Sequence, residues 1–261
     1  MRHAVIIAAY LLSTLCASAQ QTALPKDPVA VAIAQQALGI DGPPISSSTG
    51  IAILGSIQLA GDSSARAIRV YSLGNSKVRT EIDQAEGMST GVLNSGKASY
   101  QFPTGKVIRL KSVNSVAERL NIVPTLSLLA EYAADYVQVE YLGTATVGSR
   151  DVQQIALSWS QADNAVDQAE LLKRTRTVYS IDAINHQIVQ IGFHRSPEQD
   201  TGSRIPYHID YLGYQVMQGR LVPTAIATYI NKKLFSVLSI TSYREGPPLS
   251  QDSFTVQEAT R

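Results

Sequence analysis

The sequence predicts an α+β fold built on one antiparallel sheet of about eleven strands. From Ile51 onward, apolar and polar residues alternate in short runs, which is typical of strands with one buried side. These runs are separated by turn signals such as Asn94-Ser95-Gly96 and Gln218-Gly219. Such closely spaced turns favour a meander of antiparallel strands over parallel βαβ units.

The N-terminus has the composition of an export signal. Arg2 and His3 precede an apolar run from Ala4 to Leu15, and Ala17-Ser18-Ala19 supplies the small residues that signal peptidase requires. We therefore expect residues 1–19 to be a signal peptide that is cleaved near Ala19. The protein would then be periplasmic or secreted, and residues 20–261 would form a single domain.

Cleavage would also change what chemistry the chain can carry. It removes Cys16, the only cysteine, so that disulfides, thiolate zinc ligands and cysteine nucleophiles are excluded from the mature chain. Loss of Arg2 leaves basic and acidic side chains equal in number, a balance that argues against a nucleic-acid partner. No later apolar run approaches the ~20 residues that a transmembrane helix needs.

A short helix is expected before the strands. Asp27 is a suitable N-cap, Pro28 suits the first helical position, and Gly39 marks the end. The turn-rich stretch Asp41–Gly50 links this helix to the sheet.

The expected strands are short and mostly half-buried. In order along the chain they are Ile51–Leu59, Ala67–Leu73, Lys77–Ile82, Ser89–Asn94, Lys97–Phe102, Val107–Leu110, Val137–Tyr141, Val152–Ser160, Arg174–Ile181, Gln187–His194, Tyr207–Met217 and Leu234–Tyr243. Between two of them, the polar segment Gln161–Gln168 is expected to be a loop.

One helical segment interrupts the strand pattern. Ser115–Ala134 is interpreted as two short helical pieces that are broken before Pro124, because proline disfavours helix at the preceding residue. Leu126, Leu129 and Tyr132 lie at helical spacing. The segment is either a helix packed permanently over the sheet or a mobile lid over a ligand cavity, and the sequence leaves both alternatives open.

The polar residues around Asp182 invite a search for a metal or catalytic site. The histidines His186, His194 and His208 are spaced too widely for a compact ligand motif, although a cluster of His194, His208 and Asp210 across neighbouring strands is conceivable. Asp182 to Asn185 is sufficiently explained as a β-turn, in which Asp and Asn side chains bind the turn backbone. We therefore predict no metal site and no cofactor.

Catalytic motifs are also missing from the sequence. It contains no G-x-S-x-G, S-x-x-K or H-E-x-x-H motif, no phosphate-binding loop and no dinucleotide fingerprint. Glu81 and Asp83 share one side of a strand, but their alternation with Lys77 and Arg79 is more typical of a solvated charged face. We expect no catalytic residues and a protein that is not an enzyme.

The C-terminal third resembles a known family. It contains YSIDAINHQIVQIGF, a tyrosine-rich strand from Tyr207, the hairpin Gly219-Arg220-Leu221-Val222-Pro223, and a tail that ends near Phe254. Together with an N-terminal helix before the strand Gly55-Ser56-Ile57-Gln58-Leu59, this order resembles the periplasmic outer-membrane lipoprotein-sorting carriers. The resemblance lies in pattern and order over residues 27–256, and no arginine can be matched to the lid contact of that family.

The resemblance implies a strongly curved antiparallel sheet, an incomplete β-barrel, with helices covering the concave face. Apolar residues on that face would line a ligand cavity; the candidates are Ile57, Leu59, Leu126, Leu129, Tyr132, Val139, Tyr141, Leu157, Trp159, Tyr179, Ile191 and Phe193. A cavity of this kind could hold acyl chains, since each buried methylene contributes about 0.8 kcal/mol.

Three functional hypotheses follow. The first is an exported, non-enzymatic protein that binds a lipid, an acyl chain or another hydrophobic ligand, as a carrier or sensor of lipid or lipidated protein at the envelope. The second is a structural or protein-interaction module with a filled core and an envelope protein as partner. The third, a hydrolase built on His194, His208 and Asp210, has the least support.

Overall fold

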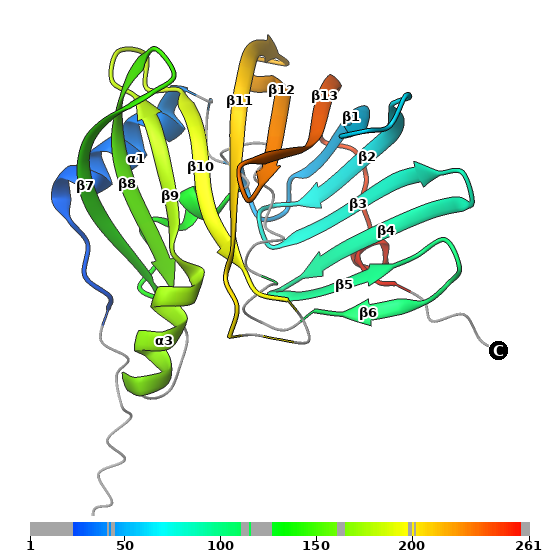
Figure 1. Cartoon of the computed structure of the whole chain (residues 1–261), viewed down its shortest axis with the longest axis horizontal. Helices are drawn as coiled ribbons and strands as arrows, with labels where there is room; N and C mark the ends of the chain where they lie inside the picture. Colours follow the sequence, from blue (N-terminus) through cyan, green and yellow to red (C-terminus); the bar gives the residue numbers. More distant parts are fainter. Residues whose placement is uncertain are drawn as a thin grey trace, which may run out of the picture.

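The computed structural model describes residues 23–40, 42, 45–110, 115, 127–160, 165–197, 200 and 202–256. These residues form one sheet of thirteen strands with two α-helices and two short 3-10 helices, so that the fold is mostly β (Figure 1). None of the helices in this part of the chain is long and apolar enough to cross a bilayer.

The strands run almost in sequence order across the sheet. They are β1 (Gly50–Leu59), β2 (Arg66–Leu73), β3 (Lys77–Gln84), β4 (Gly87–Asn94), β5 (Lys97–Gln101), β6 (Val107–Arg109), β7 (Val137–Val147), β8 (Arg150–Trp159), β9 (Thr177–Asp182), β10 (Ile188–Arg195), β11 (Ile205–Met217), β12 (Arg220–Ile230) and β13 (Lys233–Glu245).

The spatial order is β6-β5-β4-β3-β2-β1-β13-β12-β11-β10-β9-β8-β7, with every neighbouring pair antiparallel. Two meanders are thus joined in the middle by the pairing of β1 with β13, and β6 and β7 lie at opposite edges. The chain between β6 and β7 must therefore pass from one edge of the sheet to the other. The described part of this connection includes the 3-10 helix η3 (Leu128–Glu131).

The expected antiparallel meander is confirmed, and each expected strand overlaps an observed one. Thirteen strands are observed where twelve ranges were expected, because β12 was not recognised as a strand. Pro223 disfavours a strand in sequence reasoning. In the structure it pairs with Tyr214, where the register between β11 and β12 shifts, and the sheet tolerates proline at such an irregularity.

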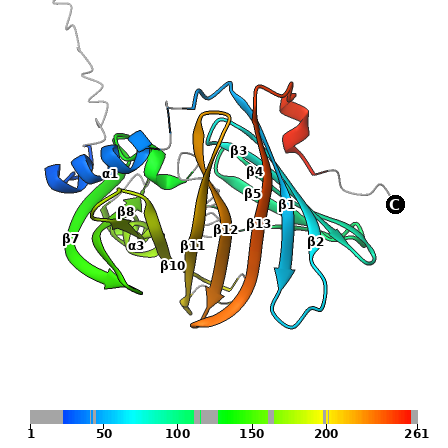
Figure 2. The ribbon, with the colours of Figure 1, turned by 90° about the horizontal axis from the view of Figure 1, so that it is seen from above.

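The helix α1 (Pro28–Ile40) begins as the sequence predicts. The Asp27 carboxylate accepts hydrogen bonds from the Val29 and Ala30 amides at 2.8 and 3.1 Å. Ala30, Ile33, Ala34 and Ala37 are buried, and the helix contacts β7, β8 and η3. The face of the sheet that α1 and η3 cover is called the inner face below; Figure 2 shows α1 above the β7 end of the sheet.

One expectation about a connecting segment was wrong. The helix α3 (Ala165–Thr175) occupies part of the expected polar loop and the start of an expected strand. Lys173 and Arg174 lie in its last turn and Glu170 pairs with Arg174 at 2.5 Å, which are features that stabilise helices. In the expected helical segment Ser115–Ala134, Ser115 is helical and Leu128–Glu131 form η3, whereas Leu126 and Pro124 lie outside the described residues.

The core lies on the inner face. It combines the buried side of α1, Leu128 and Leu129 of η3, and the inward residues of the sheet from Ile51 to Tyr243. The C-terminal 3-10 helix η4 (Gln251–Phe254) lies instead against β3 and β4 on the opposite face of the sheet, which is called the outer face below.

Candidate functional site

The inner face is tightly packed near α1 and η3. Leu129, Leu157, Tyr179 and Ile191 have no exposed surface. The Tyr179 hydroxyl accepts a hydrogen bond from the Leu129 amide at 3.2 Å and donates to the Ser127 hydroxyl at 3.4 Å, so η3 is joined to β9 by polar as well as apolar contacts. This half of the inner face has the character of a protein core.

A cavity of about 270 Å³ lies on β3, β4 and β5, toward the other edge of the sheet. Its lining residues are Val78, Thr80, Ile82, Ser89, Gly91, Val92, Leu93, Ser99, Tyr100 and Leu110, none of which is charged at neutral pH. We call this the β3–β5 cavity. Its volume is just below the ~300 Å³ at which small-molecule pockets begin.

Gly91 explains why space remains there. It pairs with Thr80 of β3 on one side and with Tyr100 of β5 on the other, so it lies on the cavity floor. A Cβ atom at Gly91 would lie 3.7 Å from Cδ2 of Tyr100, which is ordinary van der Waals contact. An isolated glycine within a strand is therefore the sequence signal that could have identified this cavity.

A second cavity of about 280 Å³ lies where the end of α1, η3 and the β2–β3 turn meet. Gln35, Leu38, Gly39, Gly42, Ile45, Asn75, Ala130 and Tyr132 line it. Glu131 holds the surrounding elements together, because it accepts hydrogen bonds from the Asn75 amide at 3.1 Å and from the Tyr136 hydroxyl at 3.0 Å.

The buried charged groups are occupied by structural contacts. The Lys26 ammonium donates to the carbonyls of Tyr132, Ala134 and Val137 at 3.1, 2.7 and 2.8 Å, which joins the N-terminal segment to β7. Burial lowers the pKa of Lys26, and the nearby Asp135 opposes this effect. The ammonium thus provides hydrogen bonds for backbone carbonyls in the turn that precedes β7 and at the start of that strand.

A second charged group lies where β12 begins and β13 ends. Arg220, only 3% exposed, pairs with Glu245 at 2.5 Å, and the Tyr243 hydroxyl donates to the same carboxylate at 2.8 Å. Burial tends to raise the pKa of Glu245, but the hydrogen bonds from Arg220 and Tyr243 outweigh it and hold that pKa below its usual value. Burial and the bond to Glu245 raise the pKa of Tyr243.

The histidines do not gather into a site. His208 stacks on Tyr229 with ring centroids 4.4 Å apart, and Asp210 accepts a hydrogen bond from Gln190 at 2.8 Å. The pKa of His194 is lowered, mainly by burial and to a smaller extent by the positive charge of Arg204. Among the described residues no three His, Cys, Asp or Glu side chains are arranged to hold a metal ion.

The residues of the β-turn that begins at Asp182 have a local role. The Asp182 carboxylate accepts hydrogen bonds from the Ile184 and Asn185 amides at 2.9 and 3.1 Å, and His186 has a positive φ of 59°. On the charged strand, Glu81 pairs with Arg79 at 2.7 Å and Asp83 with Arg69 at 2.8 Å. The turn agrees with the sequence interpretation, whereas Arg79 and Glu81 are only partly exposed on a face that was expected to be solvated.

The expected cavity residues occupy several places. Leu129, Val139, Leu157, Tyr179, Ile191 and Phe193 are buried in the core, and Ile57, Tyr132, Tyr141 and Trp159 are half-buried against it. Leu59 is half-buried in β1, and Leu126 lies outside the described residues. Tyr132 lines the second cavity, whereas the β3–β5 cavity is lined by residues that were not among the candidates.

Comparison with solved structures shows the fold. A putative outer membrane lipoprotein-sorting protein domain from Vibrio parahaemolyticus matches with a TM-score of 0.54 and 14% identity, over 87% of this chain and 96% of the other. A LolA superfamily protein from Nitrosomonas europaea matches with 0.56 and 15%, over 87% and 97%. A DUF1329 family protein from Desulfovibrio piger matches with 0.56 and 13%, over 88% and 98%.

At the level of sequence, no family model and no curated protein matches the chain. The structural likeness nevertheless covers most of it, and the resemblance to lipoprotein-sorting proteins noted from the order of its motifs is confirmed at the level of the fold.

Proposed function

We propose that the chain is an exported, non-enzymatic protein that binds a lipid, an acyl chain or another hydrophobic ligand inside a strongly curved half-barrel. The observation that carries the proposal is the β3–β5 cavity on the inner face, whose described lining residues carry no charge. Mostly apolar walls of this kind suit a hydrocarbon tail, for which binding energy comes from burial alone.

The register of the strands supports a concave inner face. Shifts occur between Leu54 and Gly55, between Tyr141 and Gly143, and on both sides of Gly213. Each extra residue in one strand of a pair bends that strand and increases its twist. Bulges in β13, β7 and β11, spread across the sheet, favour the arc of strands that is visible from above (Figure 2).

The size of the cavity indicates the strength of binding that is available. At ~30 Å³ for each small group, the β3–β5 cavity takes about nine methylenes. Their burial contributes about 7 kcal/mol at ~0.8 kcal/mol each. A single acyl chain could thus bind before any polar contact is counted.

The likeness to a lipoprotein-sorting domain suggests which ligands to test first. One fold serves many functions, so lipidated protein is one ligand class among the hydrophobic ones. The proposed role is that of a carrier or sensor at the envelope. It further includes cleavage of residues 1–19 and a single domain from residue 20 to residue 261, which N-terminal sequencing of the exported protein would test.

Native mass spectrometry after gentle extraction tests the ligand directly, because a bound lipid adds a discrete mass. A fluorescent fatty acid provides an independent measure of binding. Finding only the unliganded mass, together with no saturable binding of the fatty acid, would refute the proposal.

A structural or protein-interaction module is the second candidate, and the tight packing beneath α1 and η3 favours it. In this case the inner face serves stability alone, and an envelope protein is bound elsewhere. Affinity purification would then recover one partner in constant ratio from preparations that contain no lipid.

A further inference from the structure

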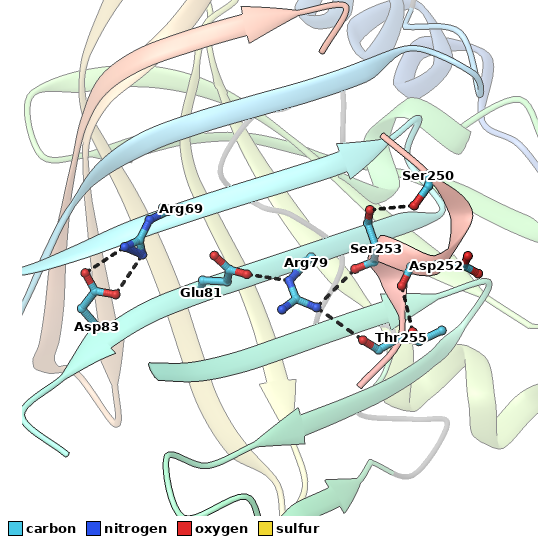
Figure 3. A network of polar contacts seen from close by, with 8 residues as sticks. All are labelled: Arg69, Arg79, Glu81, Asp83, Ser250, Asp252, Ser253 and Thr255. Carbon is cyan, nitrogen blue, oxygen red and sulfur yellow. Dashed lines mark hydrogen bonds and ion pairs between the residues drawn. The ribbon is translucent and has the colours of Figure 1, made fainter. Parts of the chain in front are cut away.

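The outer face of β3 and β4 holds a peptide segment of the chain itself. η4 and the residues after it cross these strands, and Phe254 is buried there to 1% exposure. The Arg79 guanidinium donates to the carbonyls of Ser253 and Thr255 at 3.3 Å each, as Figure 3 shows, and the Asn94 amide donates to the carbonyl of Phe254 at 3.2 Å. This face therefore binds the C-terminal segment, from the end of η4 to Thr255, through its backbone carbonyl groups.

The arginines of this face are balanced by neighbouring carboxylates. Arg79 also donates to Glu81 at 2.7 Å, and Arg69 makes a two-pronged pair with Asp83 at 2.8 and 3.0 Å (Figure 3). Glu81 thus directs the Arg79 guanidinium while leaving Nη1 for the carbonyls of the C-terminal segment.

A groove of about 520 Å³ continues beside this segment toward the edge of the sheet. Its lining residues are Val92, Asn94, Ser95, Lys97, Ser99, Val107, Arg109, Phe254, Thr255 and Val256. We call it the outer groove. Its walls combine apolar side chains with two exposed cations, Lys97 and Arg109, and no carboxylate is among these lining residues.

We propose that the outer groove binds an extended, acidic segment of a partner protein. An extended peptide points alternate side chains in opposite directions. Apolar residues at every second position would contact the half-buried Val107 and Val256, and the intervening carboxylates would reach Lys97 and Arg109. The positive lining favours an acidic segment over a basic one, because complementary charge selects partners at an interface.

The proposal is independent of any ligand on the inner face. Successive residues of a strand point to opposite faces, so Gly91 lies at the β3–β5 cavity whereas Asn94 holds the C-terminal segment outside. Binding in the outer groove can therefore be measured whether or not the protein carries lipid.

Fluorescence anisotropy with the full chain tests the proposal. The probe is a fluorescein-labelled octapeptide of alternating valine and glutamate, and its counterpart has lysine in place of glutamate. We expect saturable binding of the acidic peptide that is at least tenfold tighter than that of the basic one. Lys97→Glu should weaken binding of the acidic peptide at least fivefold, whereas Lys233→Glu, at an exposed lysine in β13, should leave it unchanged.

Other outcomes would overturn the proposal. Equal affinity for both peptides, no saturable binding, or equal effects of the two lysine variants would each exclude charge-selective recognition in the groove. A truncation after Val256 adds a further test, because binding only by the truncated chain would mean that residues 257–261 occupy the groove. If the chain instead forms concentration-dependent dimers that the acidic peptide does not dissociate, the outer groove is an interface with a second copy of the chain.

Discussion

Replacing Gly91 by leucine should block the β3–β5 cavity while leaving the sheet intact. Gly91 lies within β4, between Thr80 and Tyr100 of the neighbouring strands. Its backbone is not in the left-handed region, and the nearest atom to a Cβ would be Cδ2 of Tyr100 at 3.7 Å. A larger side chain therefore has no backbone strain to overcome and extends into the cavity.

The expected loss of affinity can be worked out from the cavity volume of about 270 Å³. A leucine side chain takes the place of about four methylenes of a bound acyl chain, each worth ~0.8 kcal/mol. The loss is then about 3 kcal/mol. At ~1.4 kcal/mol for each factor of ten, this raises the dissociation constant roughly two-hundredfold. Gly91→Ala should weaken binding by less than about tenfold on the same scale.

The same substitutions should raise stability. Glycine within a strand costs about 0.5–1 kcal/mol relative to alanine, because the unfolded chain loses more conformational freedom. Gly91→Ala and Gly91→Leu should both shift the midpoint of urea unfolding upward. Loss of ligand without loss of stability separates a blocked cavity from a damaged fold.

Titration with a fluorescent fatty acid measures the affinity of each variant, and Gly192→Leu provides a matched control. Gly192 lies within β10 between the buried Ile191 and Phe193, so it faces the other side of the sheet, and a Cβ there meets no atom within 4 Å. Unchanged affinity in Gly91→Leu would refute the assignment of the cavity as the ligand site. An equal loss in Gly192→Leu would show that the effect is not local.

Three further predictions concern stability in urea unfolding. Asp27→Ala removes the cap of α1 and should cost about 1 kcal/mol; no change would mean that the cap bonds at 2.8 and 3.1 Å are replaced by water. Phe254→Ala should cost about 3 kcal/mol, because it empties a buried site on the outer face, and a loss below 1 kcal/mol would show that the C-terminal segment is held by its polar bonds alone. Glu245 has a lowered pKa in the folded state, so its contribution is present above the unfolded value of about 4.5 and is lost as the pH falls through the folded value. Arg220→Gln should reduce this loss between pH 5 and pH 3, and an unchanged pH profile would contradict the assignment.

The strands could be predicted because apolar and polar residues alternate along them, as burial of one side requires. Val78, Thr80 and Ile82 alternate with charged residues along β3, and the structure places the first group inside and the second outside. The helix α3 escaped prediction because its sequence is more polar than that of α1 and half of its described side chains are exposed. The charges in its last turn were the remaining signal.

The sites could be predicted less well, since they depend on contacts between distant parts of the chain. Arg79 binds the carbonyl of Thr255 across 176 positions of sequence, and no local pattern indicates such a contact. The inward residues Leu157 and Tyr179 were correctly recognised as apolar positions of strands. Whether an inward residue lines a cavity or is covered depends on where the helices lie, which the strand pattern does not contain.

The lengths of the elements explain why space can remain on the inner face. α1 has thirteen residues and is thus about 20 Å long at ~1.5 Å for each residue. Thirteen strands at ~4.8 Å spacing extend over about 58 Å from β6 to β7. A helix of this length that contacts β7 and β8 covers about a third of that distance even if it crosses the strands at right angles. The inner face of β3 to β5 must therefore be covered by the connection between β6 and β7 or by a bound molecule, and the apolar lining of the β3–β5 cavity is suited to either. A ligand that replaces a protein segment there would stabilise the fold in proportion to its concentration, so that added fatty acid should raise the unfolding midpoint of the wild-type protein and leave that of Gly91→Leu unchanged.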